Sequence, residues 1–227
     1  MVKEKLDHTV FFVGDTVVPS ALLHHFHLGN KPLIAIDGGA DRCKAVGITP
    51  SVILGDLDSL KNRKEWQDKE GVRVLHFSDQ ETTDFEKGLS TFDAPMYVAL
   101  GMLGGERFDH SLAAMHAILV YAEKKIILTG GKSLAFLMPP LWQCLLKLGT
   151  LISIFPISPV FVSDSRGLEW SLRRKRLVMG KSTSISNRVV ENHVMLACDR
   201  PGAVIVLDIS TLDDVIYSLE QSSSWRT

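Results

Sequence analysis

The stretch VILGDLDSL, residues 52–60, places two aspartates directly after a short apolar run. The run stops at Gly55, and Asp56 and Asp58 follow with one residue between them. A short apolar run that ends at a glycine is typical of a buried strand in a parallel sheet. Ligands of open α/β sheets bind beyond the carboxyl ends of such strands. This stretch therefore predicts an α/β fold with a functional site at the end of the strand.

The first half of the chain alternates short apolar runs with segments of helical period, which is typical of successive βαβ units. One helix is predicted in GADRCKAVGI, ending near Gly47, and a second in TDFEKGLSTF, opened by a capping box of Thr83 and Glu86. A third is predicted in DHSLAAMHAILVYAEKK, with Asp109 at the N-cap and an apolar stripe of Leu112, Met115, Leu119 and Ala122. Strands are predicted at residues 9–13, 33–36, 52–54, 72–77, 96–100 and 125–128.

After about Gly130 the sequence changes to short apolar runs separated by glycine, proline and serine, among them TLISIFPI, LEWSL and AVIVLDI. That spacing predicts an all-β second domain, a sandwich or a small barrel. The expected fold is therefore an α/β domain with a parallel, Rossmann-like sheet over residues 1–132, followed by an all-β sandwich domain over residues 133–227.

Composition argues against several classes of protein. A net charge of −1 disfavours a broad nucleic-acid-binding surface, and RRKR at residues 173–176 is interpreted as an exposed turn or strand edge. The N-terminal residues are broken by charges and predict neither a signal peptide nor a membrane anchor. Three scattered cysteines indicate neither a disulfide framework nor a zinc site, so we expect a cytoplasmic protein.

Acidic residues follow several of the predicted strands. Asp37, Asp56, Asp58 and Asp84 come after successive strands, so their side chains are expected at one edge of the sheet. Converging carboxylates repel one another unless a cation neutralises them, and oxygen ligands suit Mg²⁺. The alternative for each acid alone is an ordinary turn former or N-cap.

Two glycine-rich stretches, DGGADR and GMLGGERFDH, lie at the same predicted edge and lead into helices. Glycine lets the backbone approach a phosphate closely, and Arg42 and Arg107 supply positive charge there. Lys87, one turn into a helix that starts at an acid, is a further candidate phosphate ligand, with a solvated surface lysine as the alternative.

In order and spacing, DGGADR, PSVILGDLDS, DQETTDFEK, GGERFDH, GLEWSL and STSISN resemble the motif series of the thiamine pyrophosphokinase family. The resemblance runs from about residue 33 to residue 187. It implies a homodimer with an ATP- and Mg²⁺-binding α/β domain and a β-sandwich that helps to bind thiamine. It also implies that the diphosphate group of ATP is transferred to thiamine, giving thiamine diphosphate and AMP.

The resemblance also implies roles for individual residues. Asp56, Asp58 and Asp84 would hold Mg²⁺ and, with Lys87, form the catalytic set, while thiamine would contact Ser184, Ser186 and Asn187. The residues implied for ATP and its phosphates are Asp37, Arg42, Gln80, Thr83, Arg107 and Asp109.

The chain departs from the family pattern at Asp41, where the family usually has asparagine, at the additional Glu106, and at Ala114, where asparagine is common. Trp170 is expected in a buried strand.

Two other functions stay open: a diphosphokinase with another acceptor, such as a hydroxymethylpterin, and a non-catalytic binder of thiamine or nucleotide. STSISN and GLEWSL favour thiamine over another acceptor, and the intact acids argue against loss of catalysis.

Overall fold

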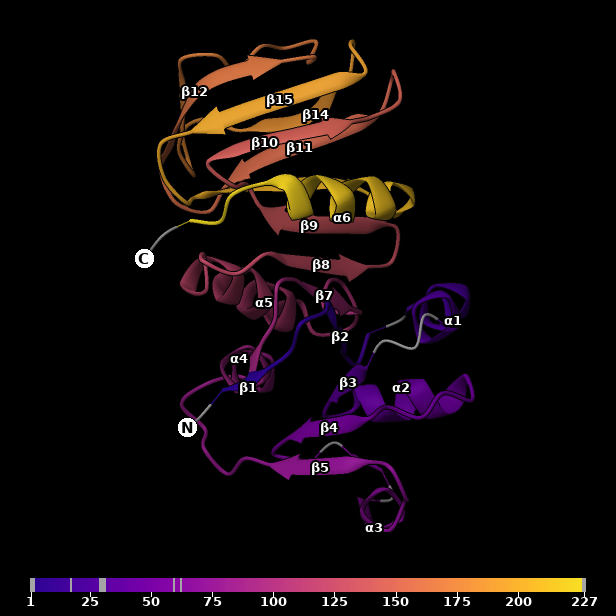
Figure 1. The fold of residues 1–227 in the computed structure, drawn as a ribbon. Helices are drawn as coiled ribbons and strands as arrows, with labels where there is room; N and C mark the ends of the chain where they lie inside the picture. The colour runs from indigo at the N-terminus through magenta and orange to yellow at the C-terminus, as the bar shows by residue number, and fades with distance from the viewer. Residues whose placement is uncertain (1–2, 17, 29–31, 59, 62, 226–227) are drawn as a thin grey trace. The chain divides into compact units, whose positions relative to one another are not determined.

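The computed structural model describes residues 3–16, 18–28, 32–58, 60–61 and 63–225, and its fold is mixed α/β (Figure 1). The chain divides into two compact units. The first contains residues 1–117 and 128–131, and the second contains residues 118–127 and 132–227. Within the described part of the chain, no helix has both the length and the apolar character needed to cross a membrane.

The first unit contains a run of parallel strands in the order β7, β2, β3, β4, β5. Four of them are buried along their whole length, as the continuous apolar runs predict. The strands of this region are β1 (Glu4–Lys5), β2 (Val10–Val13), β3 (Leu33–Ile36), β4 (Val52–Gly55), β5 (Arg73–His76), β6 (Phe92–Asp93), β7 (Tyr97–Leu100) and β8 (Ile126–Gly130). Each of the six strands predicted here is present, with ends that shift by one or two residues.

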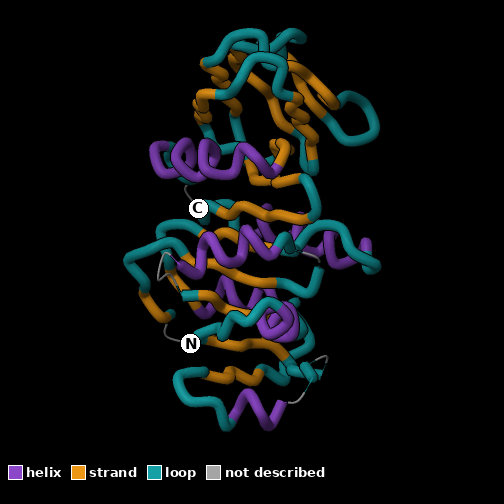
Figure 2. The backbone as a smooth tube through the Cα atoms, turned by 90° about the vertical axis from the view of Figure 1, so that its right-hand side faces the viewer, coloured by secondary structure: helices purple, strands orange, loops and turns teal. Residues whose placement is uncertain are grey.

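Helices pack against both faces of these strands, because successive side chains of a strand point to opposite faces. Phe11 of β2 stacks on Phe26 of one helix at 4.3 Å, whereas Phe12 meets Phe85 of another helix edge-on at 5.8 Å. Figures 1 and 2 show helices on both sides of the strands. The helices are α1 (Ser20–Leu28), α2 (Gly39–Ala45), α3 (Arg63–Gln67), α4 (Asp84–Thr91) and α5 (Phe108–Val120).

A glycine allows α2 to start directly beside β2. A Cβ atom added to Gly39 would lie 1.9 Å from the carbonyl oxygen of Val13, so only glycine fits there. The helix ends as predicted, since Gly47 follows it with a left-handed φ of 73°. The close approach brings the loop that begins at Asp37 to the end of β2.

Helix α5 differs from its prediction. It begins at Phe108, so Asp109 lies inside the first turn and the expected N-cap was wrong. The predicted apolar stripe was also wrong, because Leu112 is exposed and the buried positions are Ser111, Ala114, Ala117 and Ile118. Small side chains let the helix approach its neighbours closely, a feature that a search for large apolar residues overlooks.

The second unit consists mainly of antiparallel strands, in a set ordered β14, β11, β16, β9 and a sheet ordered β10, β15, β12, β13. The strands are β9 (Ser133–Leu137), β10 (Leu141–Leu145), β11 (Leu151–Pro156), β12 (Val160–Arg166), β13 (Lys175–Leu177), β14 (Ser184–Arg188), β15 (His193–Cys198) and β16 (Ala203–Asp208). LEWSL is a loop rather than a strand, and it is joined to β14 and the residue after it by a bridge between Leu168 and Val189 and by hydrogen bonds from Glu169 and Trp170.

The sequence predicted an all-β second domain, but the second unit also contains helical structure. A short 3-10 turn leads into helix α6 (Leu212–Gln221), which packs on β10. The indole N–H of the fully buried Trp142 donates to Ser218 Oγ at 2.9 Å, so this tryptophan is both packed and satisfied.

All three cysteines are free and buried, and burial raises the pKa of the thiols of Cys43, Cys144 and Cys198 to about 12, 11 and 12. Because the thiolate is the reactive form, we expect the folded protein to resist alkylation by iodoacetamide at pH 8. The same chain in urea should gain three adducts, counted by intact mass spectrometry. Equal labelling rates with and without urea would contradict the buried positions.

Candidate active site

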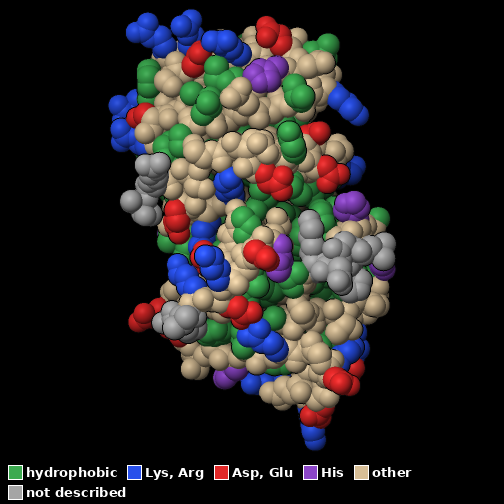
Figure 3. All heavy atoms as spheres, in the orientation of Figure 1, with side chains coloured by type: hydrophobic (Ala, Val, Ile, Leu, Met, Phe, Trp, Pro, Cys, Tyr) green, Lys and Arg blue, Asp and Glu red, His purple; other side chains and the backbone are tan. Residues whose placement is uncertain are grey.

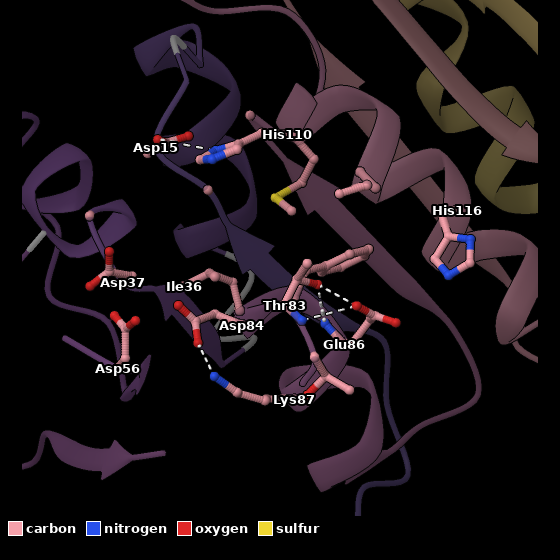
Figure 4. Close-up of a pocket in the computed structure, with 18 of the residues that line it drawn as sticks. Asp15, Ile36, Asp37, Asp56, Thr83, Asp84, Glu86, Lys87, His110 and His116 are labelled. Carbon is pink, nitrogen blue, oxygen red and sulfur yellow. Dashed lines mark hydrogen bonds and ion pairs between the residues drawn. The ribbon is translucent and has the colours of Figure 1, made fainter. Parts of the chain in front are cut away.

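A pocket of about 560 Å³ opens at the carboxyl ends of the parallel strands (Figure 4). Its walls come from the segments that follow β2, β3, β4, β5 and β7, together with the first turns of α4 and one side of α5. Parallel strands bring these segments to one edge of the sheet. Residues far apart in the sequence therefore meet in one cavity, and all of them belong to the first unit.

A buried leucine arranges the acidic loop after β4. Leu57 lies between Asp56 and Asp58 in the left-handed region, with φ 63°, and its side chain is only 4% exposed. It packs in an apolar cluster with Ile53 and Trp66. The left-handed conformation costs a non-glycine residue about 1–2 kcal/mol, and burial of the leucine side chain offsets this cost. The turn keeps the two flanking carboxylates out of this apolar cluster.

Three carboxylates converge beside this loop. One oxygen each from Asp37, Asp56 and Asp58 lie within 4.8 Å of one another. Asp37 itself has a left-handed φ of 44°, which is tolerated better by aspartate than by most residues. The predicted acidic group is thus present, but Asp37 takes part in it, whereas the sequence assigned Asp84 as the third metal ligand.

Gly55 makes room for the acids on both sides of it. A Cβ atom at this position would lie 3.0 Å from Asp84 Oδ2 and 3.1 Å from Asp37 Cβ. Its φ of 148° is also a conformation that favours glycine. The glycine of GDLDS therefore lets Asp37 and Asp84 approach the loop from either side.

Hydrogen bonds stabilise the charged form of Asp56. The backbone N–H of Asp58 donates to Asp56 Oδ1 at 3.2 Å, and Gln80 Nε2 donates to Oδ2 at 3.3 Å. The Asp58 N–H, then the Gln80 amide and more weakly the charge of Lys87, lower the pKa of the Asp56 carboxyl below its usual value. Asp56 is therefore ionised at neutral pH and suited to binding a cation.

The one buried lysine of the site is paired with an acid. Lys87 is 5% exposed, and its Nζ lies 2.9 Å from Asp84 Oδ1 (Figure 4). A buried ammonium group needs such a partner, because desolvation of an unpaired charge costs several kcal/mol. Both residues line the pocket, so the pair places one positive charge at the edge of the acidic group.

Thr83 begins helix α4, as the sequence predicts. Its hydroxyl accepts from the backbone N–H of Glu86 at 3.3 Å, and its own backbone N–H donates to Glu86 Oε2 at 3.0 Å, which completes the capping box. Phe85 and Leu89 are buried beneath the helix. Thr83 lines the pocket, but in this geometry its hydroxyl caps the N-terminus of α4. Its contact with phosphate stays a prediction.

Three of the predicted phosphate-binding residues lie outside the pocket lining. Arg42 Nε donates to the carbonyl oxygen of Asp15 at 2.7 Å, at the rim beside the loop after β2. Arg107 and Asp109 are paired with each other on the surface of α5, with Arg107 Nε 2.9 Å from Asp109 Oδ1. The Arg107 guanidinium lowers the pKa of the Asp109 carboxyl to about 2.

The pocket also contains residues that sequence reasoning missed. Asp15 follows β2 and lies 4.0 Å from His110 Nδ1 on α5, and both line the cavity with Met102 (Figure 4). Asp15 could have been found, because VFFVGD repeats the pattern of an apolar strand followed by glycine and aspartate. His110 was quoted within a motif without a role, and no local pattern marks Met102.

Asp41, where the family usually has asparagine, points its carboxylate to the backbone beyond the acidic loop. Its Oδ2 accepts a hydrogen bond from the backbone N–H of Lys61 at 3.2 Å, and the residue does not line the cavity. Lys61 lies just beyond GDLDS. Asp41 therefore ties α2 to the far end of the acidic loop.

In the second unit, Asn187 is fully buried, and its side chain forms hydrogen bonds to both the N–H and the carbonyl oxygen of Trp170. Its Oδ1 accepts from the N–H of Trp170 at 3.1 Å, and its Nδ2 donates to the Trp170 carbonyl at 2.8 Å and to Ser184 Oγ at 3.1 Å. Ser186 is exposed, with φ 54°. Trp170 is 52% exposed, so the expectation of a buried tryptophan was wrong.

Two family models match the chain. The model "Thiamin pyrophosphokinase, catalytic domain" matches residues 24–129, and "Thiamin pyrophosphokinase, vitamin B1 binding domain" matches residues 145–201. Together they cover more than two-thirds of the chain. A curated relative from Oryza sativa subsp. japonica, thiamine pyrophosphokinase 2, is 28% identical over 167 residues. That alignment covers 66% of this chain but only 62% of the relative.

Solved structures share the fold at low sequence identity. The thiamine pyrophosphokinase of Bacillus subtilis aligns with a TM-score of 0.74 and 19% identity, over 88% of this chain and 98% of that one. Yeast thiamin pyrophosphokinase aligns with a TM-score of 0.77 and 17% identity, over 95% and 93% of the two chains.

The tie between Asp41 and Lys61 can be tested by hydrogen exchange. Asp41→Ala removes the acceptor, and the Lys61 amide should exchange about fivefold faster, as expected for loss of about 1 kcal/mol. Asp41→Asn retains an acceptor oxygen and is the matched control, with exchange close to the wild type. Exchange that is equally slow in the alanine variant would mean that this hydrogen bond does not hold the loop.

Proposed function

The chain belongs to the thiamin pyrophosphokinase family, and we propose that it transfers the diphosphate group of ATP to the hydroxyl group of thiamine. The thiamine oxygen attacks the β-phosphorus, the bond between this phosphorus and the α,β-bridging oxygen breaks, and AMP leaves. The products are thiamine diphosphate and AMP. The observation that carries the proposal is the group of three carboxylates, of which Asp37 and Asp56 line the pocket together with the Asp84–Lys87 pair, inside the residues matched by the catalytic model.

The donor set of the pocket suits Mg²⁺. Carboxylate oxygens are the preferred ligands of this hard cation, and the lowered pKa of Asp56 keeps one of them charged. We propose that Asp37, Asp56 and Asp58 hold Mg²⁺, with Asp84 contributing directly or through water. Bound there, the ion would neutralise charge on the phosphates of ATP.

The remaining residues would bind and orient the triphosphate. Transfer of this kind depends mainly on positioning and on stabilisation of charge, rather than on covalent chemistry by the protein. Lys87 and Gln80 line the pocket and would contact phosphate oxygens, as would Thr83, while Arg42 would act from the rim. Asp109 and Arg107 are retained as weaker candidates, because they pair with each other outside the lining.

The proton of the thiamine hydroxyl needs an acceptor, and a carboxylate oxygen of Asp58 or Asp84 would take it. Asp84 Oδ1 already accepts a hydrogen bond from Lys87 Nζ, so this oxygen is occupied. Asp58 is the exposed member of the acidic group. We therefore favour Asp58 for this step.

The second unit would supply the thiamine contacts and the homodimer contacts of this enzyme. Ser184, Ser186 and Asn187 fall inside the region matched by the vitamin B1 binding model. Ser186 is the exposed member, whereas the Ser184–Asn187 bond points to a positioning role for the other two. In this proposal residues 1–132 form a Rossmann-like ATP and Mg²⁺ domain, residues 133–227 form a β-sandwich for thiamine binding and dimerisation, and the enzyme is cytoplasmic.

The two other functions are less favoured. A pterin diphosphokinase would share the nucleotide pocket but would not explain the vitamin B1 binding match. A non-catalytic binder would not need the acids and Lys87 to be assembled in one cavity.

The reaction is tested by incubating the purified chain with ATP, Mg²⁺ and thiamine and separating the products by chromatography. We expect AMP and thiamine diphosphate in equal amounts, and no reaction in excess EDTA until Mg²⁺ is restored. ADP in place of AMP, or AMP formation that does not depend on thiamine, would contradict the proposed transfer.

Asp56→Asn should remove the charge of the central carboxylate while keeping its shape. We expect kcat to fall by about 100-fold or more, with an unchanged circular dichroism spectrum. Asp68→Asn, an exposed site just after α3, is the matched control and should retain full activity. Near-normal turnover of Asp56→Asn would exclude Asp56 from the reaction.

A further inference from the structure

The proposed reaction leaves the RRKR run at residues 173–176 without a role. The structure confirms the interpretation made from the sequence, because Arg173 and Arg174 lie in a turn and β13 follows them as an edge strand of its sheet. All four cations of the run are exposed. A tight turn at residues 178–182 then leads toward β14 and adds another exposed cation, Lys181. We call residues 173–181 the basic edge.

Positive charge is concentrated in this part of the chain. Residues 166–188 contain seven lysine and arginine residues and a single acid, Glu169, which gives this segment a net charge of +6. The whole chain has a net charge of −1, so the rest of it carries −7. Figure 3, in the orientation of Figure 1, shows lysine and arginine side chains gathered at the end of the second unit that contains β12, the strand that pairs with β13. Such a local asymmetry is typical of a surface that binds a polyanion.

Most of the charge on the basic edge is uncompensated. Arg173 lies 3.4 Å from Asp164, so its charge is partly balanced. Lys175 and Arg176 are neighbours on β13, and their side chains therefore point to opposite faces of the sheet. The positive charge thus surrounds the free edge of the strand instead of covering one face. The cations that form no ion pair with any residue described by the structure are Arg174, Lys175, Arg176 and Lys181.

The turn after β13 places an apolar side chain among these cations. Met179 lies at its tip and is 64% exposed. Two backbone hydrogen bonds close the turn, from Val178 N–H to Ser182 O at 3.1 Å and from Ser182 N–H to Val178 O at 2.9 Å. Ser182 Oγ also donates to the carbonyl oxygen of Arg176 at 2.9 Å. The methionine is therefore held in an exposed position within the same short hairpin as the cations.

A membrane surface with anionic lipids fits this combination better than a nucleic acid or a second copy of the chain. Cations attract the lipid headgroups, and an exposed apolar side chain beside them enters the boundary with the acyl chains. A nucleic-acid strand is bound by aromatic rings along a basic groove, whereas residues 173–181 contain no aromatic residue. In a symmetric dimer formed through this edge, the same cations would face one another and repel.

We propose that the basic edge docks the protein on the surface of a bilayer that contains anionic phospholipids. Arg174, Lys175, Arg176 and Lys181 contact the headgroup phosphates, and Met179 inserts at the boundary with the acyl chains. The proposal is separate from the proposed reaction, because none of the residues assigned to ATP, Mg²⁺ or thiamine lies within residues 173–181.

The test is co-sedimentation of the full chain with vesicles of phosphatidylcholine, prepared with and without about 30% phosphatidylserine. We expect binding only when the anionic lipid is present. Binding should also be lost at high salt, because screening weakens contacts between exposed charges. Equal binding to the two kinds of vesicle, or binding to neither, would overturn the proposal.

Charge variants test the headgroup contacts. The triple variant Arg174→Gln, Lys175→Gln, Arg176→Gln should bind anionic vesicles about 100-fold more weakly, since each cation near the surface contributes about fivefold. Lys147→Gln is the matched control, because Lys147 is an exposed lysine of the same unit in the turn between β10 and β11. It should bind like the wild type.

A further pair of variants tests the insertion at the tip. Met179→Ser should weaken binding by about fivefold or more, because a polar side chain gains nothing at the acyl boundary. Leu148→Ser is the control, since Leu148 has a similar exposure of 63% in the turn between β10 and β11. That turn lies beside the far end of β14, where Leu151 pairs with Arg188, whereas the basic edge precedes the start of β14 at Ser184.

Melting curves recorded by circular dichroism show whether each variant is folded. Unchanged vesicle binding in the triple variant or in Met179→Ser would contradict docking through the basic edge. The same chain is also titrated with a single-stranded RNA of uridines. Retention of this RNA without retention of anionic vesicles would identify a nucleic acid as the partner and would reject the membrane.

Discussion

Burial of Leu57 is the constraint on which the acidic loop depends. The side chain occupies the apolar cluster beneath the loop, and the backbone adopts a left-handed turn to place it there. Asp56 and Asp58, on either side, are then kept out of that cluster, and the Asp58 N–H is brought to the Asp56 carboxylate. The apolar residue between the acids therefore determines their geometry, and the cost of a strained backbone is offset by burial.

Electrostatics around this loop follow from the same arrangement. Three carboxylate oxygens within 4.8 Å repel one another, and the surroundings reduce this repulsion only in part. Gln80 and the Asp58 N–H stabilise one charge, and Lys87 is already paired with Asp84. The remaining negative potential favours the binding of a divalent cation, in agreement with the proposed role of these acids.

The sequence predicted the features that depend on local pattern. Continuous apolar runs located the parallel strands, and the Thr83–Glu86 spacing located the start of α4, because both signals lie within a few residues. The convergence of acids after successive strands followed from topology. Whether Asp37 or Asp84 joins Asp56 and Asp58 depends on loop dihedrals and on the pairing of Asp84 with Lys87, which no spacing encodes. For α5, the predicted stripe began at Leu112, but the buried face contains Ala114, Ala117 and Ile118 instead.

Both units use a buried polar side chain to hold another residue in place. Lys87 pairs with the partly buried Asp84 in the first unit, and Asn187 forms hydrogen bonds to the backbone of the exposed Trp170 in the second. A buried polar residue is costly to leave unpaired. The Lys87–Asp84 ion pair and the hydrogen bonds of Asn187 therefore resist rearrangement.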